Sequence, residues 1–260
     1  MSRVRPKKAY GQHFLVDRNV LGVVERLAGL ERDDVVLEIG PGLGVLTTFL
    51  ADRVRHVHAV EIDRSLEEPL REVLAGRDNV ELVFADALGL DLAALEPPPG
   101  KLVANLPYNV ATPLVVETLA TAPSLTSWCV MVQREVADRF FAEPGTKAYG
   151  AVSVVVRLTA RRTGLHPVSR TVFRPPPNVD SALVAFERIA RPPNLPRVRR
   201  VVSGAFAHRR KTLANALALA GVAPREAAVE ALATIRRPAN VRAEALHPDE
   251  FVKLAEVLPR

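Results

Sequence analysis

The sequence predicts an α/β protein in which a mostly parallel sheet, covered by helices on both faces, precedes a small all-helical domain. Short apolar runs alternate with segments of helical periodicity through the first half of the chain, which is typical of such a sheet. Beyond the proline-rich segment 191–196 the chain becomes rich in alanine, and its apolar residues recur at helical spacing. We therefore expect residues 1–190 to form one domain and residues 191–260 to form the second.

The elements of the first domain are expected in a regular order. Asp17 is a candidate N-cap for a helix whose apolar residues run from Val20 to Leu27. Apolar strands are expected at residues 35–39, 56–60, 80–84, 101–104 and 128–132, and helices at residues 45–54, 66–74 and 113–121. Further strands at residues 153–157 and 181–186 are expected to close the sheet as an antiparallel pair. The second domain is expected to contain helices at residues 198–207, 211–219, 225–233 and 248–258.

Composition and charge narrow the class of protein. The chain has 260 residues, enough for a large core, and a formal net charge of +6, which favours a polyanionic partner. Its one cysteine, Cys129, excludes an internal disulfide and a multi-cysteine metal site, and its apolar neighbours predict a buried strand position. No apolar stretch is long enough to span a membrane and the N-terminus has no signal-peptide core, so we expect a cytoplasmic protein.

A polar loop follows the expected strand at residues 101–104 and reads Asn105-Leu106-Pro107-Tyr108-Asn109. The end of a strand in an open α/β sheet is the usual place for chemistry. Pro107 lacks a backbone N–H and restrains Leu106 to an extended conformation, so two carbonyl groups are free to face a ligand. Asn105 adds a side-chain oxygen and Tyr108 a flat aromatic face. The loop suits a planar base with an exocyclic amine, and a simple strand-ending turn is the alternative.

A glycine-rich turn joins the first strand to its helix and reads Glu38-Ile39-Gly40-Pro41-Gly42-Leu43-Gly44. A dinucleotide-binding turn would need Gly or Ala where Val45 stands, and Pro41 removes an N–H that would bind a pyrophosphate. Glu61 ends the second strand and suits the two hydroxyls of a ribose, while Asp86 follows the third strand and suits the amino group of an adenine. Three such elements at successive strand ends favour S-adenosylmethionine over a nicotinamide cofactor, although each acid alone could be a loop residue or a helix cap.

With these residues in place, the chain resembles the ribosomal RNA adenine dimethyltransferases, and within them the bacterial small-subunit (16S) branch linked to kasugamycin sensitivity. The segments that carry the resemblance are Gly11-Gln12-His13-Phe14-Leu15, Glu38 to Gly44, Asn105 to Asn109, Lys147-Ala148-Tyr149-Gly150, Phe173-Arg174-Pro175-Pro176-Pro177-Asn178-Val179-Asp180-Ser181-Ala182 and Arg209-Arg210-Lys211-Thr212-Leu213. The resemblance implies a Rossmann-like S-adenosylmethionine-dependent methyltransferase sheet. The implied cofactor contacts are His13, Leu15, Gly40, Glu61, Asp86 and Asn105. The family often has Asn where this chain has His13, and a backbone contact would survive that change.

The implied reaction is dimethylation of N6 on two adjacent adenosines in the hairpin near the 3′ end of 16S ribosomal RNA. For that chemistry the Asn105 side chain and the carbonyl of Leu106 or Pro107 would accept the two amine hydrogens, with no strong general base and no metal. Tyr108 is expected to stack on the base, and the resemblance places Phe173 on its opposite face. The expected partner is 16S ribosomal RNA in the small subunit or its precursor, and the enzyme is expected to be a monomer.

Clustered basic residues are candidates for RNA binding, with a solvated charged face as the alternative. They are Arg3, Arg5, Lys7 and Lys8 in an N-terminal arm, Arg161 and Arg162, and Arg199, Arg200, Arg209, Arg210, Lys211, Arg236 and Arg237 in the helical domain. Three other functions compete with the leading hypothesis. They are the large-subunit (23S) adenine methylation that confers macrolide resistance, ribosome assembly with methylation secondary, and a nicotinamide-dependent oxidation. The Leu106 form of the loop and the Arg209-Arg210-Lys211 segment favour the small-subunit enzyme.

Overall fold

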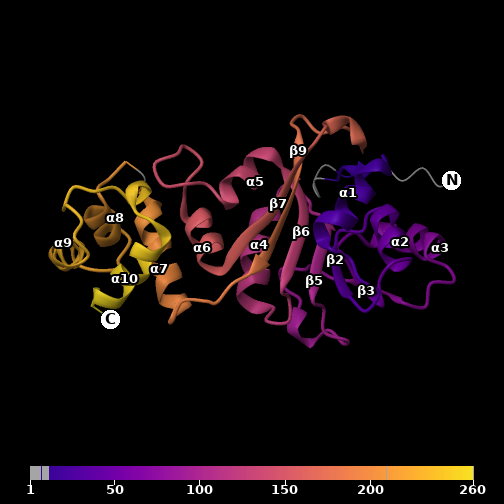
Figure 1. Cartoon of the computed structure of the whole chain (residues 1–260), viewed down its shortest axis with the longest axis horizontal. Coiled ribbons are helices and arrows are strands. Elements are labelled where there is room, and N and C mark those ends of the chain that lie inside the picture. The colour runs from indigo at the N-terminus through magenta and orange to yellow at the C-terminus, as the bar shows by residue number, and fades with distance from the viewer. Residues whose placement is uncertain (1–6, 8–11, 209, 260) are drawn as a thin grey trace. The chain divides into compact units, whose positions relative to one another are not determined.

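The computed structural model describes residue 7, residues 12–208 and residues 210–259 (Figure 1). These residues form two compact units. The first contains the described residues up to Ala137 together with Arg162–Arg188, and the second contains Asp138–Arg161 and the described residues from Ile189 onward. The predicted boundary after residue 190 lies close to residue 189, where the chain passes from the first unit to the second for the last time. The sequence did not indicate that residues 138–161 belong with the C-terminal helices.

A seven-stranded sheet forms the first unit, in the order β4-β3-β2-β5-β6-β9-β7. Its strands are β2 (Val35–Ile39), β3 (His56–Glu61), β4 (Val80–Phe84), β5 (Lys101–Asn105), β6 (Ser127–Gln133), β7 (Ala160–Val168) and β9 (Ser181–Arg188). Neighbours from β4 to β6 are parallel, and β9 pairs antiparallel with β6. The predicted mostly parallel sheet is therefore confirmed. The chain moves outward from β2 to β4 and then restarts on the other side of β2 with β5, which makes the β2–β5 edge a topological switch point.

The predicted helices are present as α1 (Asn19–Ala28), α2 (Val45–Ala51), α3 (Glu67–Val73) and α4 (Ala111–Thr121), whereas α5 (Arg134–Phe140) was not predicted. Helix α1 shows how local sequence sets the bounds. The N-cap residue is Arg18 and not the predicted Asp17, although the Asp17 carboxylate accepts the Asn19 N–H at 2.8 Å. Gly29 ends the helix in the left-handed region at φ 54°. Val20, Leu21 and Val24 lie on one helical face and are buried.

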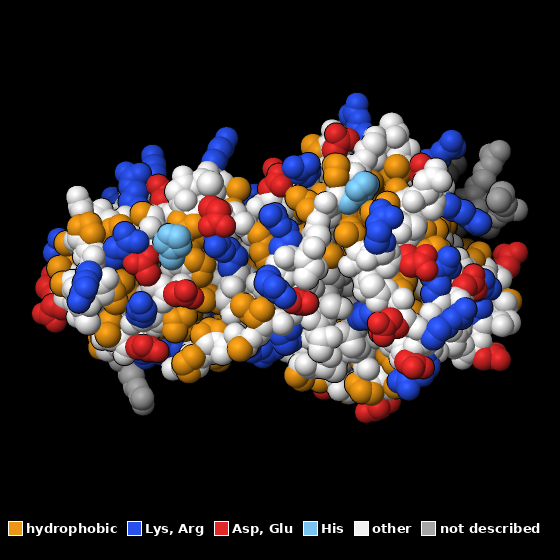
Figure 2. Space-filling view, viewed as in Figure 1, with side chains coloured by type: hydrophobic (Ala, Val, Ile, Leu, Met, Phe, Trp, Pro, Cys, Tyr) orange, Lys and Arg blue, Asp and Glu red, His pale blue; other side chains and the backbone are white. Residues whose placement is uncertain are grey.

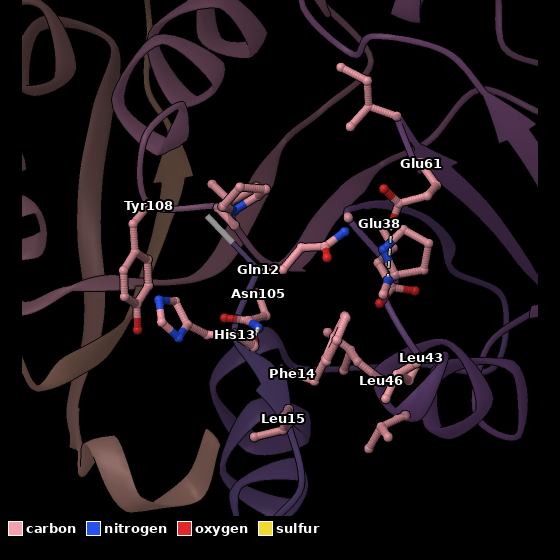
Figure 3. Close-up of a pocket in the computed structure, with 17 residues that line it drawn as sticks. Gln12, His13, Phe14, Leu15, Glu38, Leu43, Leu46, Glu61, Asn105 and Tyr108 are labelled. Atoms are coloured by element: carbon pink, nitrogen blue, oxygen red, sulfur yellow. Dashed lines mark hydrogen bonds between the residues drawn. The ribbon is translucent and has the colours of Figure 1, made fainter. Parts of the chain in front are cut away.

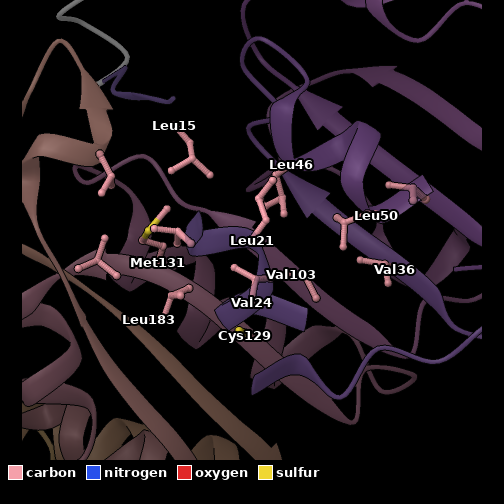
Figure 4. Packing of buried hydrophobic residues seen from close by; sticks show 14 of the residues in the cluster. Leu15, Leu21, Val24, Val36, Leu46, Leu50, Val103, Cys129, Met131 and Leu183 are labelled. Carbon is pink, nitrogen blue, oxygen red and sulfur yellow. The ribbon is translucent and has the colours of Figure 1, made fainter. Parts of the chain in front are cut away.

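The core of this unit is aliphatic. Leu21 and Val24 of α1 pack with Val36 of β2, Val103 of β5 and Met131 of β6 in one cluster of buried side chains (Figure 4). Each fully buried Val or Leu contributes roughly 1.5–3 kcal/mol of transfer free energy. Cys129 belongs to the same cluster with 1% of its surface exposed, as predicted, and burial raises the pKa of its thiol to about 12.

Two short strands connect distant parts of the first unit. Strand β1 (Phe14–Leu15) pairs antiparallel with β8 (Phe173–Arg174), so that Leu15 lies opposite Phe173. A 3-10 turn at Arg170–Val172 precedes β8, and others lie at Arg64–Leu66 and Leu92–Ala94. The segment that enters the first helix is therefore held against the segment that precedes β9.

The second unit is helical, as predicted for the C-terminal residues. Its helices there are α7 (Leu195–Ala207), α8 (Leu213–Leu219), α9 (Arg225–Thr234) and α10 (Pro248–Val257), with a 3-10 turn at Ala243–Ala245. They are joined by α6 (Ala151–Thr159), which packs against α7 and α10. The Tyr149 hydroxyl donates to the Leu246 carbonyl at 2.7 Å, and the Gly145 N–H donates to the Glu244 carbonyl at 2.8 Å. These contacts explain why residues 138–161 join the C-terminal helices.

The strand predicted at residues 153–157 is wrong, because these residues lie within helix α6. The run Val154-Val155-Val156 has β-branched side chains, which favour strands by intrinsic propensity. In the protein all three side chains are buried. Burial on several faces of the helix outweighs local propensity here. Strand β7, which begins directly after α6, had not been predicted.

No helix among the described residues is long and apolar enough to cross a membrane.

Candidate active site

The glycine turn after β2 adopts a conformation that other residues rarely tolerate. Gly40, Gly42 and Gly44 have φ angles of 76°, 59° and 76°, all in the left-handed region. A Cβ on Gly42 would come within 2.9 Å of the Phe14 ring, and one on Gly40 would lie 3.4 Å from the Pro107 ring. The turn therefore touches both the N-terminal motif and the Asn-Leu-Pro-Tyr loop, three segments that are far apart in the sequence.

A pocket opens at this meeting point, beside the switch between β2 and β5 (Figure 3). Four segments line it: residues 12–15, the stretch from Glu38 to Leu46, residues 61–62 and residues 105–108. An adjoining pocket shares Gly40, Glu61, Ile62 and Pro107 and extends to Asp86. The structure thus brings together His13, Leu15, Gly40, Glu61, Asp86 and Asn105, the six predicted cofactor contacts.

Glu61 ends β3 and is 5% exposed. Its carboxylate accepts the Gly42 N–H at 3.2 Å and the Asp63 N–H at 2.9 Å, which fixes its orientation. Desolvation nevertheless raises the pKa of this carboxyl above its ordinary value. Asp86 is exposed, and its carboxylate accepts the Leu88 N–H at 3.0 Å. A single elongated ligand could reach both acids through the two adjoining pockets.

Glu38 lines the same pocket, although sequence analysis assigned it no role. It is an acid in the otherwise apolar strand β2, and that was the signal which could have identified it. The side chain is 1% exposed, and its Oε2 has no hydrogen-bond partner among the described residues. Desolvation, with a further contribution from the negative charge of Glu61, raises the pKa of Glu38 to about 8. Two buried carboxyls in one pocket favour a ligand that brings positive charge.

Asn105 ends β5 with its amide held in one orientation. Its Nδ2 donates to the His13 carbonyl at 3.0 Å, while Oδ1 is buried and accepts no hydrogen bond from the described residues. In the loop that follows, the Pro107 carbonyl accepts the Val110 N–H at 3.1 Å, whereas the Leu106 carbonyl accepts none from the described residues. Of the two carbonyls proposed from sequence, that of Leu106 is the one left available.

Tyr108 is positioned by contacts at both its hydroxyl and its ring. The hydroxyl shares a hydrogen bond with the Ser181 hydroxyl at the start of β9, and burial raises the pKa of the phenol. The His13 imidazole stacks on the ring, with centroids 5.3 Å apart and planes inclined by 30° (Figure 3). His13 Nδ1 lies 2.8 Å from the Pro175 carbonyl. The His13 imidazole therefore covers a face of the Tyr108 ring, which was predicted to stack on the substrate base.

Phe173 was predicted to stack on the substrate base, but its side chain lies in the hydrophobic core. It is 1% exposed and packs with Leu15, Met131 and Leu183 in the main core. It does not line the pocket beside Tyr108. The sandwich of a base between Tyr108 and Phe173 stays a prediction, and it needs a movement of Phe173 out of this core.

A polar anchor next to the pocket was not predicted. The Asp63 carboxylate accepts hydrogen bonds from Lys7 Nζ at 2.7 Å, Gln12 Nε2 at 3.0 Å and Ser65 Oγ at 2.6 Å. Burial opposes ionisation, but these donors outweigh it and lower the pKa of Asp63 to about 2. Lys7, expected to bind RNA, is thus engaged by a buried acid. Arg3, Arg5, Lys8, Gly11 and Arg209 lie outside the described residues.

A parallel sheet with a ligand pocket at its switch point and an antiparallel strand beside β6 is the architecture of Rossmann-like methyltransferases, which use S-adenosylmethionine. The model of the ribosomal RNA adenine dimethylase family matches residues 3–258, and the chain belongs to that family. It is an adenine-modifying transferase of one-carbon groups, and its substrate is ribosomal RNA. The nicotinamide-dependent alternative is not supported.

Individual relatives agree with this assignment. A ribosomal RNA small subunit methyltransferase A of Rubrobacter xylanophilus is 50% identical over 252 residues, covering 96% of this chain and 94% of the relative. The crystal structure of the 23S rRNA methyltransferase ErmE is 31% identical, has a TM-score of 0.67 and covers 95% of this chain and 100% of its own. A dimethyladenosine transferase from Plasmodium falciparum shares the fold at 24% identity, with a TM-score of 0.76 over 93% and 96% of the two chains.

The described pocket fits S-adenosylmethionine. That molecule carries a positive sulfonium and a positive ammonium group, and the pocket offers two buried carboxyls, one with an oxygen lacking a partner. The left-handed turn at Gly40 and Gly42 lets the backbone lie close to Pro107 and Phe14, which line the pocket with it. The buried Oδ1 of Asn105 lies at the same pocket, where an amine to be methylated would need an acceptor.

Proposed function

We propose that the enzyme dimethylates N6 of two adjacent adenosines in the 3′-terminal hairpin of 16S ribosomal RNA during small-subunit assembly. The observation that carries this proposal is the buried, unpartnered Oδ1 of Asn105 close in sequence to the available carbonyl of Leu106. The choice of the small subunit is supported by the higher identity to a small-subunit methyltransferase, 50%, than to the 23S enzyme, 31%. We further infer that it works as a monomer in the cytoplasm, where ribosomal subunits are assembled.

The chain's main catalytic task is to orient a weak nucleophile. The amino group of adenine donates its lone pair into the ring, so the nitrogen must become pyramidal before it can attack. Asn105 Oδ1 and the Leu106 carbonyl accept its two hydrogens, which raises electron density on nitrogen and fixes its direction of approach. S-adenosylmethionine supplies the electrophilic methyl group. No strong base is needed, because the nitrogen loses a proton readily once it is cationic.

The N-terminal segment positions the Asn105 amide through its backbone. The His13 carbonyl accepts the Nδ2 hydrogen, which leaves Oδ1 as the atom that faces the substrate amine. This contact does not depend on the His13 side chain, so a family member with Asn at that position can make it. The imidazole has a separate effect, since a base that stacks on Tyr108 must displace it or share the face.

Cofactor binding is assigned to the acids and the glycine turn. Glu61 accepts the ribose hydroxyls, and Asp86 accepts the adenine amino group of the cofactor. Glu38 faces the positive groups at the other end of the ligand. This order follows the lining of the two adjoining pockets, in which Glu38 belongs to the first, Asp86 to the second and Glu61 to both.

RNA binding is assigned to exposed cations of the second unit. Arg200, Arg210, Lys211 and Arg236 are exposed there, whereas Nε and Nη2 of Arg237 donate to the Glu250 carboxylate at 2.6 and 2.8 Å. Figure 2 shows Lys and Arg side chains interspersed with Asp and Glu on the face drawn, so this face is not uniformly basic. Phosphate contacts by a few exposed side chains suit recognition of a folded subunit by shape.

The decisive experiment supplies labelled S-adenosylmethionine to purified unmethylated small subunits, with large subunits as the control. Labelled nucleosides are then located by mass spectrometry of RNA fragments. Dimethyladenosine at two neighbouring 16S positions is the expected result. Label confined to large-subunit RNA would overturn the choice of subunit, and tight binding to small subunits without label would instead support an assembly factor.

A further inference from the structure

A second cluster of ligand-type side chains lies at the end of β3 opposite to Glu61. His56 and His58 are two residues apart on this strand, so their side chains lie on the same face of the sheet. Glu81 of β4 is paired in register with His58 and joins them on that face. One nitrogen from each histidine and one oxygen of Glu81 all lie within 4.8 Å of one another.

In neutral His58 the Nδ1 atom faces another hydrogen-bond acceptor. The side chain is fully buried, and its Nε2 lies 2.8 Å from the Pro97 carbonyl. A carbonyl only accepts, so Nε2 carries the hydrogen. In neutral His58 the Nδ1 lone pair then faces the Glu81 carboxylate oxygen, 2.7 Å away, which also offers only lone pairs when ionised. A positive species, either a proton or a metal ion, is needed at Nδ1.

The position of His56 favours a metal ion over a proton at His58 Nδ1. Its Nε2 is buried, makes no hydrogen bond with the described residues and lies 3.9 Å from the same Glu81 oxygen. A proton on His58 would satisfy the His58–Glu81 pair but would leave this nitrogen unsatisfied. A metal ion would accept both imidazoles and the carboxylate together. The two rings are already adjacent, with centroids 4.4 Å apart.

We propose that His56, His58 and Glu81 form a binding site for one divalent transition-metal ion, of which Zn²⁺ is the best match. Imidazole and carboxylate ligands in a set of three suit Zn²⁺, with a water molecule as the fourth ligand, whereas Mg²⁺ and Ca²⁺ prefer oxygen ligands. Tetrahedral Zn²⁺ at its usual bond lengths separates neighbouring ligand atoms by about 3.3 Å. Two of the three present separations, 2.7 and 3.9 Å, lie on either side of that value and the third is no more than 4.8 Å, so rotations of the side chains would bring the three atoms to that spacing.

The surroundings of the cluster support the same conclusion. A metal-binding histidine usually donates its other ring N–H to a carbonyl or carboxylate, and His58 does so to Pro97. The Glu81 side chain is 50% exposed and that of His56 20%, which gives an ion access from solvent. The site joins β3 to β4 far along the strand from the methylation pocket, so it stabilises the sheet and takes no part in the reaction.

The test is zinc binding by the untagged full-length protein after removal of metals with a chelator. Zn²⁺ is titrated in competition with a chromophoric chelator, on wild type and on His56→Gln and Glu81→Gln. Loss of an outer-shell partner typically costs about 10–100-fold in metal affinity, so loss of a ligand is expected to weaken binding by at least about 100-fold. The exposed His208, outside the cluster, gives the control His208→Gln, which should bind Zn²⁺ like wild type.

Two further readouts make the result decisive. Circular dichroism and S-adenosylmethionine binding should be unchanged in the variants, which separates loss of the metal site from loss of the fold. Crystals soaked in Zn²⁺ should show an anomalous peak between His56, His58 and Glu81. Equal zinc affinity in wild type and His56→Gln, or no binding at micromolar Zn²⁺, would overturn the proposal in favour of a protonated His58 paired with Glu81.

Discussion

Glu38, which lines the pocket, and Asp63, which lies next to it in the chain after Ile62, are both buried acids, yet their pKa values are shifted in opposite directions. Glu38 is 1% exposed and has a pKa of about 8, while Asp63 is 3% exposed and has a pKa of about 2. Desolvation and the nearby charge of Glu61 raise the pKa of Glu38, whereas hydrogen-bond donors outweigh desolvation at Asp63. Asp63 is bonded by Lys7, Gln12 and Ser65, whereas one oxygen of Glu38 has no partner among the described residues.

The comparison separates groups that stabilise the fold from groups that are kept for a ligand. The Asp63 anchor has its hydrogen bonds satisfied in the free protein, and it holds the N-terminal segment in place. Glu38 and Asn105 keep buried oxygens without partners, which costs stability until a ligand binds. Changes in the first group should therefore affect stability, and changes in the second should affect binding and turnover.

Asn105→Ala is expected to have the largest effect, because it removes the acceptor that orients the amine. Removal of one such electrostatic contact typically costs about 10²–10³-fold in turnover. Methylation of small subunits should fall by that factor, with the thermal unfolding midpoint nearly unchanged. Asn105→Asp keeps an acceptor oxygen and should retain more activity than Asn105→Ala. Near-normal turnover in folded Asn105→Ala would contradict the assigned role.

Asp63→Asn should affect stability instead. A pKa of about 2 in the folded protein, against an ordinary 3.8, corresponds to about 2 kcal/mol of the free energy of unfolding at neutral pH. Because the folded pKa is the lower one, this contribution is present above pH 4 and is lost as the pH falls towards 2. Urea unfolding at several pH values measures it. The control is Asp52→Asn, which breaks an exposed pair with Arg77 and should change stability by less than about 1 kcal/mol.

Glu38→Gln should have the opposite effect on stability to Asp63→Asn. The pKa of Glu38 in the folded protein lies above its ordinary value, so between pH 4.5 and about 8 the unfolded chain releases this proton while the folded protein retains it. The free energy of unfolding therefore falls as the pH rises through this range. The variant should therefore be at least as stable as wild type at pH 8. Cofactor affinity, measured by calorimetry, should rise with pH up to about 8 in wild type, because a cationic ligand prefers the carboxylate. In Glu38→Gln it should be weaker at pH 8 and should change less with pH, since only the raised pKa of Glu61 remains, and a parallel pH dependence in both proteins would contradict this role.

His13→Asn is expected to have the smallest effect. The backbone contact with Asn105 remains, so the dissociation constant of the cofactor should stay within about twofold. The ring that covers Tyr108 is removed, and an aromatic pair is worth roughly 0.5–1.5 kcal/mol. The KM for small subunits should therefore fall a few-fold. A KM that rises instead would show that the imidazole helps to bind the base.

Much of the fold follows from local sequence. The strands of the parallel sheet and the C-terminal helices are where apolar periodicity predicts them, since each of these segments has a pattern that agrees with its final environment. Helix α6 was predicted wrongly, because its valines favour a strand by local propensity and packing in the second unit outweighs that preference. The positions of Asn105, Glu61 and Asp86 at or just after strand ends were predictable because the apolar pattern of each strand shows where the strand ends.

Contacts between distant segments were not predictable from pattern. Nothing around Lys7 indicates that its partner is Asp63, and nothing around His13 indicates that its ring covers Tyr108. The burial of Phe173 in the core depends on the pairing of β1 with β8, a two-residue contact without a periodic signal. The role of Glu38 was visible as an acid in an apolar strand, but its ionisation depends on Glu61 and on burial.

The tethering of the N-terminal segment has a consequence for the order of events during synthesis. Lys7 and His13 leave the ribosome before the residues that bind them. Lys7 is bonded to Asp63, 56 positions along the chain, the His13 carbonyl to Asn105, 92 positions along, and the His13 ring to Pro175, 162 positions along. The wall of the pocket formed by residues 12–15 therefore stays incomplete until Asn105 has been translated. A nascent chain cut short before Asn105 should not retain the cofactor, which makes cofactor binding a late marker of folding on the ribosome.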